Sequence, residues 1–259
     1  VAVARKDRGI RHYALPLSLI GGAISIYHYQ LQRFPQQHSA SEVRLWTTAI
    51  YIGIAAMGLN LLTGYNGQVS IGHGAFYGIG AYTSALLVSE HGWSYLATIP
   101  CAAVISLIVG VAIGVPALRV KGLYLALVTL GLAVVFPDIT KKFVQGVGGT
   151  NLVRVSRVDL AAPSWVPAKA AALDQWGYYL TLTIALILLL GIWLFVRGRF
   201  GRALIAVRDH EAAATTVGVN LARTKVSAFA LSAAYAGIAG ALSVQVTGLA
   251  NAEKIGTFN

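Results

Sequence analysis

The sequence GYYLTLTIALILLLGIWLFV occupies positions 177–196 and contains no charged residue. An α-helix rises about 1.5 Å per residue, so about 20 apolar residues are needed to cross the hydrocarbon core of a bilayer. A helix that is apolar on every side is typical of a membrane span or of a very large core. This stretch therefore predicts a transmembrane helix.

The composition of the whole chain agrees with this interpretation. Hydrophobic residues make up 56% of the 259 residues and charged residues only 11%, whereas a typical soluble domain carries about 25% charged residues. One soluble core could not bury so much apolar surface. The other candidate spans are 13–29, 43–62, 71–88, 95–115, 122–139 and 226–249. We therefore predict an all-α, polytopic transmembrane helical bundle that forms a single domain over residues 1–259.

The basic residues predict how the chain is oriented. The net charge is +11, from 20 Lys and Arg against 9 Asp and Glu. No basic stripe is interleaved with stacking aromatic residues, which argues against nucleic acid as a partner. Basic residues gather in the N-terminal tail and in segments 116–121 and 197–225, as is typical of cytoplasmic span ends. We expect a multi-pass protein of the plasma (inner) membrane with a cytoplasmic N-terminus, and segment 140–176 is expected to be an external loop with short helical or extended pieces.

The residues from Gly58 to Tyr82 differ from a plain lipid-facing helix. Seven glycines lie among amide, hydroxyl and imidazole side chains. Polar side chains at membrane depth are costly unless they face protein or water, and glycines permit a broken helix and close backbone contact. The stretch predicts a broken glycine-rich segment, which either lines a translocation path or forms a tight turn with small-residue packing. The candidate path residues are Asn60, Gly64, Gln68, Ser70, Gly72 and His73.

Segment 197–225 predicts a helical element at the membrane surface. Residues 202–217 contain neither glycine nor proline. Their apolar positions form a modest amphipathic face: Leu204, Val207 and Ala212–Ala214. A second short helix is expected to begin at Asp209 or His210 and to end at Gly218. Such a helix suits docking into a groove on a partner protein, and a solvated charged loop is the alternative.

Several ordered motifs resemble a known family. Glu211-Ala-Ala-Ala, followed by Gly218, resembles the EAA coupling loop of ABC importer permeases. The stretch GLNLLTGYNGQVSIGHGAF at 58–76 resembles the signature of branched-chain amino-acid permeases. The M-type subunit of that family is similar to PALRVKGLYLALVTL at 116–130, GRALIAVRDHE at 201–211 and AGIAGAL at 236–242. The resemblance covers residues 43–250.

The resemblance implies a function and a set of partners. The chain would be the permease subunit of an ABC importer for leucine, isoleucine and valine, and not an enzyme. It would form a heterodimer with a related permease subunit, with two ATP-binding subunits that use ATP and Mg, and with an extracytoplasmic substrate-binding protein. Segment 197–225 would be the cytoplasmic coupling loop, with ATPase contacts at Arg208, Asp209, Glu211, Ala212, Ala213 and Gly218. Family members continue through further spans, so we expect this chain to be C-terminally truncated.

Other functions stay open at this point. A urea or short-chain amide importer permease shares both motifs. An ATP-independent secondary transporter would need an intramembrane acid or lysine, and Asp138 follows Pro137 at the expected membrane edge. A membrane enzyme would need a partner for His73, and no carboxylate or cysteine lies at a suitable spacing. The sequence contains no phosphate-binding loop and no metal-ligand cluster, so no cofactor or metal is expected on this chain.

Overall fold

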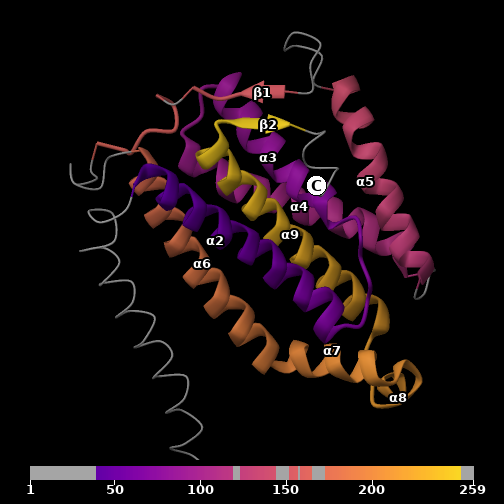
Figure 1. Ribbon diagram of the computed structural model, residues 1–259. Helices are drawn as coiled ribbons and strands as arrows, with labels where there is room; N and C mark the ends of the chain where they lie inside the picture. Colours follow the sequence, from indigo (N-terminus) through magenta and orange to yellow (C-terminus); the bar gives the residue numbers. More distant parts are fainter. Residues whose placement is uncertain (1–38, 119–122, 144–151, 157, 165–172, 252–259) are drawn as a thin grey trace, which may run out of the picture. The chain divides into compact units, whose positions relative to one another are not determined.

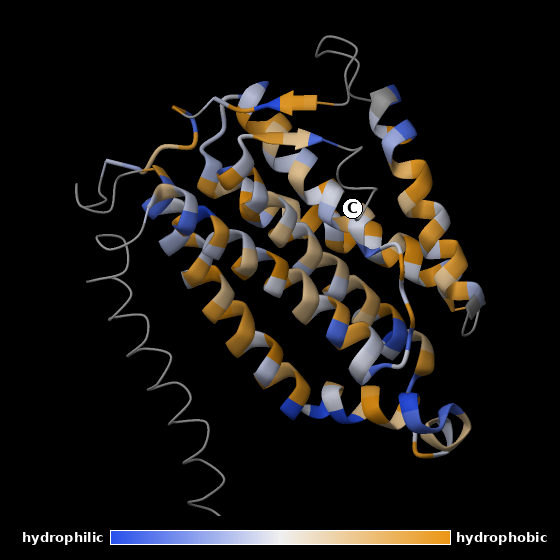
Figure 2. Cartoon of the chain, viewed as in Figure 1, coloured by the Kyte–Doolittle hydropathy of each residue, from blue (hydrophilic) through white to orange (hydrophobic). Residues whose placement is uncertain are grey.

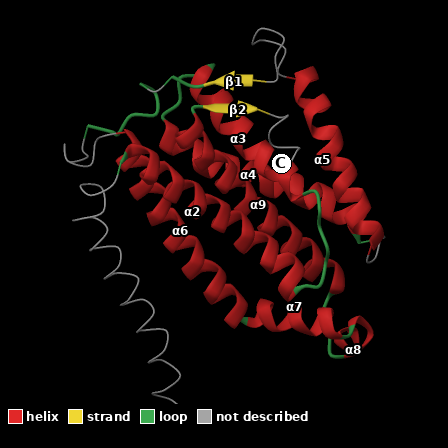
Figure 3. Ribbon diagram, in the orientation of Figure 1, coloured by secondary structure: helices red, strands yellow, loops and turns green. Residues whose placement is uncertain are grey.

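The structure is a computed structural model that describes residues 39–118, 123–143, 152–156, 158–164 and 173–251 (Figure 1). Nearly all regular structure in these ranges is helical, as Figure 3 shows. The helices are α2 (Ala40–Asn60), the π-helix η1 (Leu61–Tyr65), α3 (His73–Ser89), α4 (Tyr95–Ala117), α5 (Leu123–Phe143), α6 (Leu173–Arg197), α7 (Arg199–Asp209), α8 (Glu211–Thr216) and α9 (Leu221–Thr247). The strands are β1 (Leu152–Arg154) and β2 (Leu249–Asn251). The prediction of an all-α bundle is confirmed.

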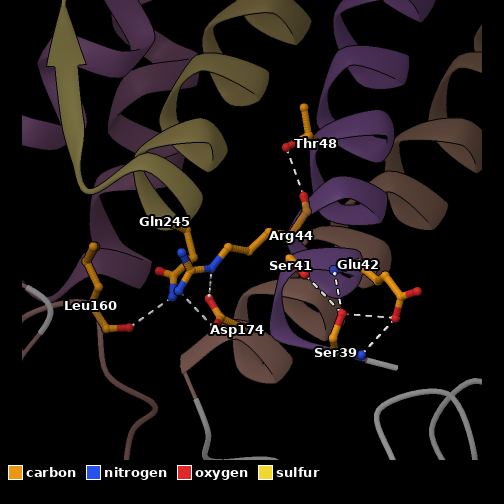
Figure 4. A network of polar contacts seen from close by, with 8 residues as sticks. All are labelled: Ser39, Ser41, Glu42, Arg44, Thr48, Leu160, Asp174 and Gln245. Carbon is orange, nitrogen blue, oxygen red and sulfur yellow. Dashed lines mark hydrogen bonds and ion pairs between the residues drawn. The ribbon is translucent and has the colours of Figure 1, made fainter. Parts of the chain in front are cut away.

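The chain divides into two compact units, Val1–Val43 and Arg44–Asn259. In the first unit, Ser39 and Glu42 form a capping box at the start of α2 (Figure 4). The Ser39 N–H donates to the Glu42 carboxylate at 2.8 Å, and the Glu42 N–H donates to Ser39 Oγ at 3.4 Å. All the elements after α2 belong to the second unit. The single transmembrane domain over residues 1–259 stays a prediction.

Four helices in the described part of the chain are long and apolar enough to cross a membrane. They cover Ala40–Tyr65, Tyr95–Pro116, Leu173–Arg197 and Leu221–Thr247. The sequence predicted spans at these four places, so those four predictions are confirmed. The predicted span at 13–29 lies outside the described residues.

The two remaining candidate spans form shorter membrane-type helices. α3 begins only at His73 and has 17 residues, which gives it a length of about 25 Å. A membrane span needs about 17–25 residues, so α3 lies at the lower limit and the span predicted at 71–88 stays a prediction. α3 begins two residues later than predicted because the chain before His73 leaves the helical conformation. In α5 the apolar stretch is limited to Tyr124–Thr140.

α9 is the central helix of the second unit, and Figure 1 shows it between α2 and α4. In its most apolar window 78% of the residues are buried, compared with 11% in α6. Glycines bring its backbone against α3. A Cβ atom on Gly80 would overlap the Gly237 carbonyl, and one on Gly240 would overlap the carbonyl of Tyr77. Close backbone packing through small residues is a main source of helix association in lipid.

The outer helices present apolar side chains to their surroundings. Ile187 and Leu194 on α6 are exposed, as are Val104 and Ile108 on α4. Figure 2 shows hydrophobic residues along α6, while hydrophilic residues gather around α7 and α8. A lipid-facing surface explains why these side chains need no protein cover.

α2 and α6 begin at the same end of the second unit. The Arg44 guanidinium donates from Nε to Asp174 Oδ1 at 2.7 Å and from Nη2 to Oδ2 at 3.1 Å (Figure 4). A bidentate pair of this kind fixes geometry as well as distance. α7 and α8 follow the other end of α6, so the ion pair and the α7–α8 element lie at opposite ends of that helix.

The two strands lie at the same end of the second unit as the Arg44–Asp174 ion pair. β1 and β2 pair antiparallel, with Val153 opposite Ala250. β1 lies within segment 140–176, so the prediction of a short extended piece there is confirmed. Residues 144–151 and 165–172 of that segment lie outside the described ranges.

Candidate functional site

The glycine-rich segment breaks the helical structure between α2 and α3. α2 continues into the π-helix η1, and the chain from Asn66 to Gly72 is not helical (Figure 3). Gly67 has a φ of +71°, a backbone conformation that L-residues with a side chain rarely adopt. π-turns within helices are rare and are often found at functional sites. The predicted break is therefore confirmed, while its role in transport stays a prediction.

Several backbone and amide groups of the break are paired within it, whereas the buried Asn66 Oδ1 has no hydrogen-bond partner among the described residues. The Gln68 N–H donates to the Leu62 carbonyl at 3.1 Å, and the Gly67 N–H donates to the Thr63 carbonyl at 3.2 Å. The Asn66 side-chain amide donates to Gln68 Oε1 at 2.8 Å, and both side chains are buried. A non-helical segment is tolerated at membrane depth only when its polar groups are paired in this way or face water.

His73 lies in a buried hydrogen-bond network with two serines. Its Nε2 lies 2.9 Å from Ser232 Oγ, and its Nδ1 lies 3.5 Å from Ser70 Oγ. The Ser232 hydroxyl donates to the Gly58 carbonyl, so its oxygen is left to accept from His73 Nε2–H. His73 is thus satisfied by hydrogen bonds to α9 and to the break, with no carboxylate or thiol among these partners.

Gly72 is a close-packing position. A Cβ atom there would overlap the Thr129 carbonyl of α5, and the Ile71 N–H donates to Thr129 Oγ1 at 3.1 Å. A larger residue at Gly72 would therefore disturb folding as well as any transport role. Asn60, the last residue of α2, is exposed. A Cβ atom on Gly64 would overlap Asn60 Oδ1, so this position also favours glycine.

The predicted surface element consists of two helices, which confirms the expected second short helix. α7 ends at Asp209, His210 is extended with φ −158° and ψ 101°, and α8 then begins at Glu211. His210 Nδ1 accepts from the Ala213 N–H at 3.2 Å and so caps α8. On α7, Leu204 and Val207 are buried, as the predicted amphipathic face requires.

α8 ends at Thr216, and Gly218 terminates it two residues later, as the sequence predicts. Gly218 has a φ of +84°. Its N–H donates to the Thr215 carbonyl, and the Val219 N–H donates to the Ala214 carbonyl, both at 3.0 Å. This pair of bonds is the Schellman motif, in which a left-handed residue satisfies the last carbonyls of a helix.

α8 is anchored at its first residue and open along one side. Lys225 Nζ lies 2.6 Å from Glu211 Oε1, and the Lys225 side chain is only 10% exposed. Ala214 is buried, whereas Ala212 and Ala213 are exposed. A helix with small exposed residues and a fixed base leaves room for a partner's surface to approach closely.

The structure brings the two groups of candidate residues into contact. Arg208 Nη1 donates to the Gly64 carbonyl at 2.8 Å. The two residues are 144 positions apart, and sequence reasoning placed them in separate sites. It also missed the roles of Thr129, Ser232 and Lys225, because a buried hydroxyl or lysine inside an apolar or basic stretch carries no distinctive local pattern.

The candidate path residues do not line the apolar groove at the start of α9. This groove has a volume of about 750 Å³ and lies between α4, α7 and α9, with Val115, Phe200 and Val226 among its lining residues. Within the described ranges, no group of three or more His, Cys, Asp or Glu side chains is placed to hold a metal ion.

Comparison with known proteins identifies the family. Residues 42–259 match the family described as the branched-chain amino acid transport system permease component. The chain belongs to this family. It is 32% identical over 227 residues to the high-affinity branched-chain amino acid transport system permease protein LivM of Salmonella typhimurium, covering 80% of this chain and 53% of the relative. It is 33% identical over 225 residues to LivM of Escherichia coli K12, with the same coverage of each chain.

This permease-family chain spans about half the length of the curated relatives it matches. No solved structure matches it. The family and the apolar helices together make it a multi-pass protein of the inner membrane.

Proposed function

We propose that this chain is the permease subunit of an ABC importer and forms part of the path for leucine, isoleucine and valine. The names of its relatives support this substrate class. The observation that carries the proposal is α8, a capped surface helix with exposed Ala212 and Ala213 between the last two long helices of the described chain. A related permease subunit, two ATP-binding subunits and an extracytoplasmic binding protein complete the proposed transporter.

ATP is used on the partner subunits in this proposal. The chain carries no phosphate-binding loop of its own, so ATP and Mg bind elsewhere and the coupling is mechanical. α8 docks in a cleft of an ATP-binding subunit, with Arg208, Asp209, Glu211 and Gly218 around the contact. Closure of the ATP-binding subunits then moves α8 and α7 together.

The orientation of the chain follows from the same assignment. Docking on a cytoplasmic ATPase puts α7 and α8 in the cytoplasm, and α6 then leads from the outside inwards. The Arg44–Asp174 pair lies at the outer end. If the span predicted from the sequence at 13–29 crosses the membrane, the N-terminus is cytoplasmic, in agreement with its basic residues.

The path is proposed to run beside the glycine-rich break. Asn60 is exposed at the end of α2, and Gly64 lies near it in η1. The other candidate residues are buried: Gln68, Ser70, Gly72 and His73. This placement supports a role for the buried residues in holding the shape of the break, with Asn60 as the group that faces the path.

The test of function is substrate-stimulated ATP hydrolysis. The full-length protein is co-purified with its companion subunits, reconstituted in lipid, and assayed with its binding protein. Leucine, isoleucine and valine are expected to stimulate hydrolysis and to accumulate in vesicles, and urea and short amides are expected to do neither. Stimulation by urea instead would assign the other importer class, and uptake without ATP would contradict the ABC assignment.

The docking role of α8 is tested at Ala213. Gly218 is unsuitable because its φ of +84° strains any side chain. Ala213→Trp adds a large side chain at an exposed helical position, so it is expected to release the ATP-binding subunits while leaving expression unchanged. His91→Trp, exposed beyond the far end of α3, is the control. Retained association and transport in Ala213→Trp would refute docking through α8.

A further inference from the structure

Arg208 completes the carbonyl end of a helix on another element. The last carbonyls of any helix lack intrahelical donors. Here Leu62 and Thr63 accept from backbone N–H groups of the break, while Gly64 accepts from Arg208 Nη1. α2 has no basic residue in its own last turn. Arg208 therefore supplies, from α7, the positive charge that favours a helix C-terminus.

The contact extends from the guanidinium to the side-chain stem. A Cβ atom on Gly67 would lie 2.8 Å from Arg208 Cγ, so the stem packs on the bare Cα of that glycine. Asp209 holds the guanidinium from the other side, with its Oδ1 3.0 Å from both Arg208 Nε and Nη2. Arg208 thus contacts both Gly64, in η1, and Gly67, in the non-helical segment that follows.

Apolar side chains of α7 and η1 also pack together. Leu204 of α7 is fully buried and belongs to one cluster with Leu61 and Leu62 of η1. α7 and η1 are therefore packed together as well as hydrogen-bonded. Because α7 contacts η1 in both ways, we expect a movement of α7 to displace η1 and the adjoining Gly67.

The end of the break next to α3 contacts different helices. Ile71 and Gly72 contact Thr129 of α5, and His73 bonds to Ser232 of α9. The segment from Asn66 to Gly72 is consequently attached to α7 at one end and to the interior of the bundle at the other. Because this segment is short and non-helical, we expect a movement of one end relative to the other to change its backbone conformation.

We propose that Arg208 is a positioning residue that links the α7–α8 element to the glycine-rich break, so that displacement of α8 is transmitted to the segment from Asn66 to Gly72. This inference rests on the proposed function for the origin of the displacement. The link itself is a property of this chain. Among the residues around the proposed docking contact, Arg208 differs because its guanidinium donates to the Gly64 carbonyl, so its replacement is not expected to release the ATP-binding subunit.

The link is tested first without any measurement of transport. The full-length protein is placed in lipid nanodiscs, and hydrogen exchange is followed at the amides of Gly67 and Gln68, which donate back into η1. Arg208→Gln removes a charged donor and is expected to speed exchange there by about tenfold. Arg202→Gln is the matched control, because the Arg202 guanidinium donates to the Arg197 carbonyl beside its own helix. Equal exchange in both variants would overturn the link.

The second measurement uses the complete transporter and separates the two proposals. Arg208→Gln is expected to keep the ATP-binding subunits, to lose at least tenfold in substrate transport, and to hydrolyse ATP without stimulation by substrate. Arg208→Lys, which keeps a charged donor, is expected to recover part of the transport. Release of the ATP-binding subunits, or normal transport by Arg208→Gln, would overturn the positioning role. If the unaltered chain fails to bind ATP-binding subunits, the proposed function fails, and the exchange measurement still decides the link.

Discussion

At the scale of single residues, one serine on α9 connects three parts of the chain. Ser232 donates to the Gly58 carbonyl of α2 and accepts from His73 at the start of α3. Its side chain is fully buried. A buried hydroxyl that is used in both directions helps to specify how the helices meet, because a hydrogen bond lost in apolar surroundings is not replaced by water.

Replacing this serine should destabilise the bundle by a limited amount. Ser232→Ala removes two hydrogen bonds, each worth about 1 kcal/mol, but His73 Nε2 can still donate to the backbone carbonyl at position 232, 3.3 Å away. Thermal unfolding of the purified protein should occur at a lower temperature. Ser227→Ala is the control, because the Ser227 hydroxyl bonds to the Thr224 carbonyl of its own helix. An unchanged melting temperature in Ser232→Ala would refute this account.

At the scale of elements, the packing of α3 on α9 depends on bare backbone. Gly80 lies directly on Gly237, so that their backbones touch. Gly80→Leu should force the helices apart and prevent the bundle from forming. Protease resistance of the membrane-inserted protein measures this. Gly131→Leu on α5, where nothing lies within 4 Å of the added atom, should remain resistant. If the two variants behave alike, α9 does not depend on this contact.

An ion pair with α9 helps to hold α8 in position. Lys225→Met should remove this pair from Glu211, which is 32% exposed and can be hydrated. The loss of stability should therefore be smaller than the roughly 3–5 kcal/mol seen when a fully buried pair is broken. The expected result is faster hydrogen exchange in α8 with unchanged exchange in α4. Restored protection in the double variant Glu211→Lys and Lys225→Glu would attribute the effect to the pair, and slow exchange in Lys225→Met would refute the anchor.

At the scale of the whole molecule, the two ends of α6 should lie on opposite sides of the membrane. His210 precedes α8, and His91 follows α3 near the opposite end, and both are exposed. In a Cys101→Ala background, a membrane-impermeant thiol reagent added to spheroplasts should label His91→Cys and leave His210→Cys unlabelled. Labelling of His210→Cys from outside would reverse the proposed orientation.

The sequence by itself determined the features that depend on neighbouring residues. Apolar composition indicated lipid as the solvent, and runs of about 20 apolar residues located four helices that the structure confirms. Gly218 ends α8 because a left-handed turn there needs no partner beyond the same helix. The break after α2 follows from a density of glycine and amide residues that no regular helix tolerates.

Only the tertiary structure decided how these parts meet. A hydropathy pattern places 71–88 in the membrane, but the start of α3 at His73 depends on Thr129 and Ser232 on other helices. The Arg208–Gly64 bond joins residues 144 positions apart, and no local sequence pattern pairs one with the other. The physical reason is that side chains and carbonyls left unsatisfied by local structure find partners through helix packing. The identity of those partners is set by which helices lie side by side, and local sequence does not encode that arrangement.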